Sequence, residues 1–136
     1  MSIHARSDRD FIESFEACTL PEGEFRHADH VRLAWLYLRR LPAAEALARF
    51  SEGLRRFARA IGKPGLYHET ITWAYLLLIR ERMERSGPAE AWEGFASRNP
   101  DLLVWKPSIL GAYYREETLR SDLARRVFLL PDRPRL

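Results

Sequence analysis

The chain of 136 residues has 46% hydrophobic and 30% charged residues and a formal net charge of +3, which is typical of one globular domain spanning 1–136. A single cysteine excludes an internal disulfide framework. No apolar run approaches the roughly 20 residues that cross a bilayer, so we expect a soluble, cytoplasmic protein. Arginines and acidic residues are mixed along the chain, which indicates a solvated surface and speaks against a nucleic-acid partner.

The hydrophobic pattern of the first half predicts three helices. Apolar residues recur at helical spacing in a first helix, expected over about 8–18. A second helix is expected over about 27–40, where apolar residues follow an i, i+3, i+4, i+7 spacing. Pro42 ends it and predicts the start of a third helix, which the segment GKPG at 62–65 stops.

The second half predicts a long central helix and several shorter ones. A fourth helix over about 68–85 is apolar on nearly every face, which suits an element packed on several sides. A short fifth helix is expected over about 89–97, then a connector with a turn or two of helix from Ser108, and a last helix over about 115–128. No segment alternates like a strand. The predicted fold is all-α, a compact up-and-down bundle of about five to six helices.

Three of the four histidines stand at predicted helix starts: His27 and His30 begin the second helix, and His68 begins the fourth. Short connections favour antiparallel neighbours, so the second, third and fourth helices should run up, down and up. The second and fourth helices then start at the same end of the bundle. Each imidazole begins an apolar stripe that faces inward. We therefore expect the three histidines to meet in a pocket at one end.

The chemistry of these histidines favours a metal site as the first hypothesis. The positive end of a helix lowers the pKa of a histidine, and the neutral imidazole that results can ligate a metal or act as a base. Three histidines with an open fourth position match a site for a divalent metal such as zinc, iron, manganese, nickel or copper. On this hypothesis His27, His30 and His68 bind the metal, which activates water or a small-molecule ligand.

Other polar residues are expected around this pocket. Asp29 and Glu69 lie about 100° from the neighbouring histidines on a helix, so they are poorer ligand candidates, though either could act behind the ligands. Thr72 lies one turn into the fourth helix, where its hydroxyl could orient an imidazole or touch a ligand, and Tyr75 follows on the same face. The connector before the last helix could cover the same end with Asp101, Trp105 or Lys106.

Two alternatives stay open beside the metal hypothesis. In one, the histidines only cap and pack, and the protein is a non-enzymatic interaction module or homodimer whose tryptophans serve an interface. In the other, a metal-free pocket uses a histidine as an acid, a base or a contact to a small molecule. The chain has no phosphate-binding loop, dinucleotide fingerprint or nucleophile elbow, so nucleotide-dependent and serine-hydrolase chemistry have no support.

Three segments, FRHADHVRLAWLYL, LYHETITWAYLLLI and YYREETLRSDLARRVFLLPDRP, together resemble a group of small bacterial proteins known as hypothetical sequences. The resemblance covers most of the chain and rests on F-x-H-x-x-H-V and Y-H-x-T-I-T patterns. It implies a stand-alone bacterial domain whose matching positions include His27, His30 and His68. It implies no activity.

Overall fold

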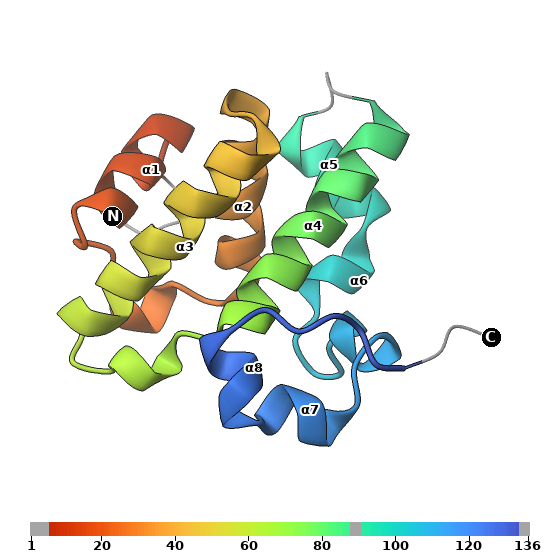
Figure 1. Ribbon diagram of the computed structural model, residues 1–136. Coiled ribbons are helices and arrows are strands. Elements are labelled where there is room, and N and C mark those ends of the chain that lie inside the picture. Colours follow the sequence, from red (N-terminus) through yellow and green to blue (C-terminus); the bar gives the residue numbers. More distant parts are fainter. Residues whose placement is uncertain (1–5, 88–90, 134–136) are drawn as a thin grey trace.

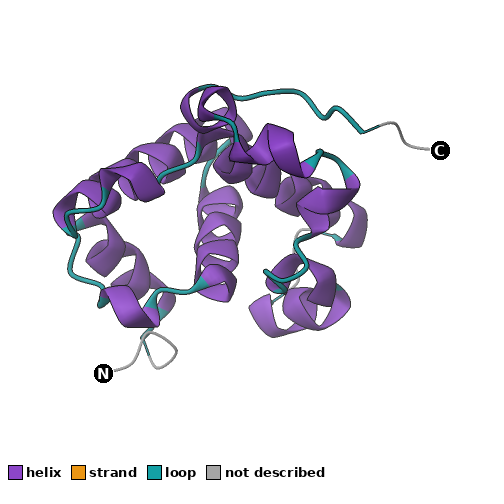
Figure 2. Cartoon of the chain, turned by 90° about the horizontal axis from the view of Figure 1, so that it is seen from below, coloured by secondary structure: helices purple, strands orange, loops and turns teal. Residues whose placement is uncertain are grey.

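The computed structural model describes residues 6–87 and 91–133, and all regular structure within these ranges is helical (Figures 1 and 2). The α-helices are α1 Asp8–Glu16, α2 His27–Arg40, α3 Ala43–Ala60, α4 Glu69–Ser86, α5 Trp92–Arg98, α6 Pro100–Leu103, α7 Glu116–Arg120 and α8 Asp122–Arg126. The 3-10 helices are η2 Glu22–Glu24, η3 Pro64–Leu66 and η4 Ile109–Ala112. The all-α prediction is confirmed. No helix in these ranges is long and apolar enough to span a membrane.

The three longest helices, α2, α3 and α4, run up, down and up in Figure 1, as the short connections predict. They also pack against one another pairwise. The starts of α2 and α4 and the end of α3 therefore lie at the lower end, together with η3, α7 and α8. Helix α1 packs on α2 and α3, while α5 and α6 flank α2 and α4 on the other side. This arrangement brings the three predicted histidine positions to one end of the bundle.

Side chains cap the N-termini of α1, α2 and α4. The Ser7 hydroxyl accepts a hydrogen bond from the Asp10 amide at 3.1 Å and caps α1. The Asp29 carboxylate accepts from the Arg26 amide at 3.0 Å at the start of α2. His68 precedes α4 and caps it, because its Nδ1 accepts from the Ile71 amide at 3.1 Å. Residues at or next to the start of each helix therefore stabilise its first turn.

The structure differs from the expected helices in four places. Helix α1 ends at Glu16, because Cys18 adopts a left-handed backbone with φ 59°. The expected last helix is two helices, α7 and α8, separated at Ser121, whose backbone is extended with ψ 150°. The Ser121 hydroxyl accepts from the Ala124 amide at 3.1 Å and so starts a new helix. Helix α6 was not expected. Helix α5 begins at Trp92, and the predicted positions 89 and 90 lie outside the described residues.

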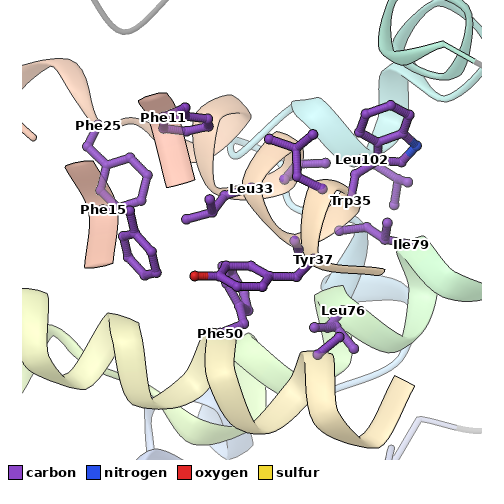
Figure 3. Packing of buried hydrophobic residues seen from close by; sticks show 14 of the residues in the cluster. Phe11, Phe15, Phe25, Leu33, Trp35, Tyr37, Phe50, Leu76, Ile79 and Leu102 are labelled. Atoms are coloured by element: carbon purple, nitrogen blue, oxygen red, sulfur yellow. The ribbon is translucent and has the colours of Figure 1, made fainter. Parts of the chain in front are cut away.

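Aromatic side chains from α1, α2 and α3 form much of the core (Figure 3). The Phe15 ring is fully buried, with its centroid 5.7 Å from that of Phe25, 6.5 Å from that of Phe50 and 6.4 Å from that of Phe57. Gly53 of α3 lies directly against this ring. Such tight packing fixes α1 on α3 and holds one wall of the cavity described next.

Candidate functional site

A cavity of about 580 Å³ lies between α2, α3 and α4 at the end where α2 and α4 begin. This volume is typical of pockets that bind small molecules. His27, His30 and His68 all line it, as the bundle topology predicts. The remaining lining residues are Glu22, Phe25, Arg26, Val31, Ala34, Phe50, Leu54, Phe57, Ala58, Ile61, Leu66, Tyr67, Ile71, Thr72, Tyr75, Ile79, Trp105 and Arg125. Most of this wall is apolar.

His68 uses both of its ring nitrogens to hold the fold. Its Nε2 lies 2.7 Å from the carbonyl oxygen of Leu119, and since a carbonyl only accepts, Nε2 carries the proton and donates it. Its Nδ1 accepts the hydrogen bond from the Ile71 amide. A metal ligand needs a free lone pair on one nitrogen. In this geometry His68 acts as a cap and as a link to the C-terminal helices.

His27 is oriented by a backbone carbonyl. Its Nε2 lies 2.9 Å from the oxygen of Leu102 and donates to it, which leaves the proton off Nδ1. The ring packs between two aromatic side chains, with centroids 4.7 Å from Tyr75 and 5.1 Å from Trp105. In the neutral form of His27, Nδ1 is therefore the atom able to accept a hydrogen bond or a proton.

Helix α6 sets this orientation, because it carries the Leu102 carbonyl. Arg82 of α4 donates to the Asn99 side-chain oxygen at 2.8 Å and pairs with Asp101 at 2.8 Å. The Asn99 amide group donates to the Phe95 carbonyl at 2.9 Å and joins α6 to α5. The unexpected helix thus holds an imidazole of the cavity in one tautomer.

His30 differs from the other two histidines, since neither of its ring nitrogens hydrogen-bonds to any described residue. Its ring packs edge-on against Phe25, with centroids 4.1 Å apart. Burial, and to a smaller extent the nearby His27, lowers the pKa of His30 to about 4. His30 is therefore neutral near pH 7 and presents one donor and one acceptor nitrogen.

The pKa values of all three histidines are lowered, in the direction that the sequence predicts, but the main cause is different. Burial away from water is the largest effect at His27, His30 and His68. At His27 and His68 the hydrogen bonds to the Leu102 and Leu119 carbonyls oppose it, because they favour the protonated ring. The cavity is lined by neutral imidazoles at pH 7.

Of the other residues expected around the site, the structure brings Thr72, Tyr75 and Trp105 to the cavity wall. The Tyr75 hydroxyl is hydrogen-bonded to the Ser108 hydroxyl at 2.6 Å, which ties α4 to η4. Trp105 remains 44% exposed at the opening and covers His27. The connector thus partly covers this end of the bundle, as the sequence predicts.

Asp29, Glu69 and Lys106 do not line the cavity. Asp29 is buried at the start of α2, where it accepts from the Arg26 amide. Glu69 pairs with Arg55 at 2.8 Å and accepts from the Tyr67 hydroxyl. Lys106 is exposed beside Trp105. Asp29 and Glu69 thus stabilise the helix starts near the cavity.

Within residues 6–87 and 91–133 there is no group of three or more His, Cys, Asp or Glu side chains that could hold a metal ion. The engaged nitrogens of His68 give a physical reason for this at the cavity. The metal hypothesis stays a prediction, and the geometry favours the metal-free alternative that the sequence also left open.

Sequence reasoning missed two cations of this site, Arg26 and Arg125, which line the opening and are exposed. Arg26 directly precedes His27, so its position beside the site could have been found from the predicted start of α2. Arg125 comes from α8, and no local pattern connects it with the first histidine pair. The wall contributed by α3 was likewise predicted only as part of a core.

No protein-family model, curated protein or solved structure matches this chain.

Proposed function

We propose that the protein binds a small, largely apolar organic molecule in the cavity between α2, α3 and α4, with the His30 imidazole as its polar contact. One observation carries this proposal: an apolar wall surrounds an imidazole whose nitrogens have no partner among the described residues. A partly buried polar group without a partner is unfavourable, and a bound hydroxyl or carbonyl group would satisfy it. Apolar walls with one or two placed polar groups are typical of small-molecule sites.

The pKa of His30 favours binding over general base catalysis at this residue. A base works best when its pKa lies near the working pH. With a pKa lowered to about 4, His30 is neutral but only weakly basic at pH 7. A neutral imidazole still hydrogen-bonds well in both directions. The residue is therefore suited to recognising a polar group on a ligand.

Calorimetric titration with naphthol, an apolar bicyclic ring with one hydroxyl, tests the proposal. Ala58→Leu places a larger side chain on the cavity wall, while Ala60→Leu adds the same atoms at an exposed position of α3 that does not line the cavity. We expect wild type and Ala60→Leu to bind naphthol, Ala58→Leu to lose binding, and His30→Leu to bind about tenfold more weakly, since a hydrogen bond is lost. Equal binding by both alanine variants would refute the cavity as the site.

Metal analysis of the protein purified without a histidine tag tests the competing hypothesis. Binding of one metal ion through His27, His30 and His68 would require the His68 Nδ1 to release the Ile71 amide, and ligation through Nε2 would also break the hydrogen bond to the Leu119 carbonyl. If the wild type contains one equivalent of zinc, iron, manganese, nickel or copper and His68→Asn contains none, the metal hypothesis is right and the present proposal is wrong.

A second candidate function, metal-free acid–base catalysis, is favoured by the fixed tautomer of His27. The Leu102 carbonyl holds the proton on Nε2 and leaves Nδ1 as the base, an arrangement that catalytic histidines use. Hydrolysis of naphthyl acetate tests it. Turnover by wild type that is absent in His27→Gln, while naphthol binding persists, would support catalysis; equal background rates would leave binding as the function.

A further inference from the structure

Two arginines line the cavity, and neither pairs with a carboxylate of a described residue. Arg26 directly precedes α2, and Arg125 lies in α8; both line the cavity and are exposed. The Arg26 Nε donates to the Gly23 carbonyl at 3.3 Å, and the Arg125 Nη1 donates to the Gly65 carbonyl at 2.5 Å. Neither side chain forms an ion pair with any described residue.

Two carboxylates near the cavity are held by other cations. Glu22 also lines the cavity, but it pairs with Lys63 at 2.6 Å. Asp101 lies close enough to influence the pKa of Tyr75, but it is held by Arg82 in a bidentate contact at 3.0 and 2.8 Å. Neither of these two carboxylates is therefore available to pair with Arg26 or Arg125. Each guanidinium keeps N–H donors that no described residue uses.

Behind the opening, the cavity offers only uncharged groups. Its polar side chains there are the neutral imidazoles and the hydroxyls of Tyr67, Thr72 and Tyr75. Further along the helices the wall consists of Val31 and Ala34 from α2, Leu54 from α3 and Ile79 from α4. From the start of α2 to Ala34 this wall extends roughly 10 Å, at 1.5 Å per helical residue. A charged group has no counter-ion along this wall, whereas an apolar chain does not need one.

We propose that the ligand of this cavity is an amphipathic carboxylate, whose acid group binds at Arg26 and Arg125 and whose apolar chain extends between α2, α3 and α4. This inference rests on the proposed function, because it assumes that the cavity is a binding site. Guanidinium groups hydrogen-bond carboxylates through two parallel N–H donors and so recognise both charge and shape. The charge pattern, positive outside and apolar inside, matches the two parts of such a molecule.

Calorimetry with decanoate and decanol, which share one apolar chain and differ in their head groups, tests the inference. We expect Arg26→Gln and Arg125→Gln each to weaken decanoate binding about fivefold, and the double variant to weaken it by roughly tenfold or more, with decanol binding unchanged in all of them. Arg40→Gln and Arg80→Gln are matched controls, because both are exposed and neither lines the cavity. The preference for decanoate should also fall as salt is added.

The outcomes separate this inference from the proposal beneath it. Decanoate and decanol could both bind, lose binding in Ala58→Leu and keep their affinities in the arginine variants. In that case the cavity binds ligands, but the carboxylate inference is wrong. If the control variants weaken decanoate as much as Arg26→Gln does, only the net charge matters and the inference is again wrong. If neither decanoate nor decanol nor naphthol binds, both the inference and the proposed function fail.

Discussion

At the scale of single residues, His30 and His68 show how one residue type can serve opposite purposes within one cavity. His68 is satisfied at both nitrogens by backbone groups, whereas His30 is satisfied at neither among the described residues. Both stand at the start of a helix, so sequence position alone cannot distinguish them. What separates them is the carbonyl or amide that the folded chain brings within hydrogen-bonding distance.

The capping role of His68 predicts a loss of stability when it is replaced. His68→Ala removes the bonds to the Ile71 amide and the Leu119 carbonyl, and we expect the free energy of unfolding to fall by about 2 kcal/mol. His68→Asn should lose about half as much, because asparagine is itself a good N-cap. Urea unfolding at pH 7 measures both variants. Unchanged stability in His68→Ala would show that capping is not the role of His68.

The lowered pKa of His30 predicts that the protein loses stability as the pH falls. The unfolded chain binds a proton at His30 near the ordinary histidine pKa of 6.5, whereas the folded protein does so only near 4. The unfolded state therefore holds more protons between these values, and the stabilisation present above pH 6.5 is progressively lost as pH falls to about 4. His30 alone accounts for up to about 3 kcal/mol of this change.

Urea unfolding of wild type and His30→Gln at several pH values checks this effect. The variant should keep a smaller dependence on pH, since the pKa values of His27 and His68 are lowered in the same direction. An identical pH dependence in both proteins would mean that the His30 ring is not buried.

At the scale of secondary structure, periodicity predicted the long helices well and the short ones poorly. Helix α2 matches its predicted bounds of 27–40, because a strong apolar stripe and Pro42 define it. The break at Ser121 could not be read from periodicity, because α7 and α8 keep helical spacing on both sides of it. There one serine hydroxyl accepts a single amide hydrogen bond and redirects the chain.

The contact between α1 and α3 predicts an unusual response at Gly53. Alanine normally stabilises a helix by about 1 kcal/mol relative to glycine. A Cβ at position 53 would overlap the Phe15 Cε2 atom, and the Phe15 ring is enclosed by other aromatic rings. We therefore expect Gly53→Ala to lower the free energy of unfolding by roughly 1 to 2 kcal/mol, because overpacking outweighs helix propensity.

Gly111→Ala is the control for this substitution, since its Cβ would meet nothing within 4 Å. The double variant Gly53→Ala with Phe15→Leu should be more stable than the sum of the two single changes predicts, because the smaller side chain relieves the clash. A stabilised Gly53→Ala protein would show that α1 can shift away from α3.

At the scale of the whole molecule, topology was enough to predict where the histidines meet but not what they do there. Short connections between antiparallel helices brought His27, His30 and His68 to one cavity without any long-range signal in the sequence. The groups that engage two of them come from far along the chain: the carbonyl bonded to His27 is 75 residues away, and that bonded to His68 is 51 residues away. Such backbone partners carry no side-chain identity that a sequence pattern could reveal.

An apolar cavity in a small protein also predicts a conflict between stability and binding. The cavity leaves apolar wall surface without protein contacts, so a side chain that fills part of it should stabilise the unliganded protein. Ala58→Leu adds three carbon atoms at such a position, and each buried methylene contributes about 0.8 kcal/mol before entropy and strain are subtracted. We expect a gain of about 1 kcal/mol in urea unfolding together with the loss of naphthol binding, while Ala60→Leu, at an exposed position, changes stability by less than about 0.5 kcal/mol. A destabilised Ala58→Leu protein would contradict the open space assigned to this wall. A more stable Ala58→Leu protein that no longer binds naphthol would show that the open cavity serves ligand binding and lowers stability.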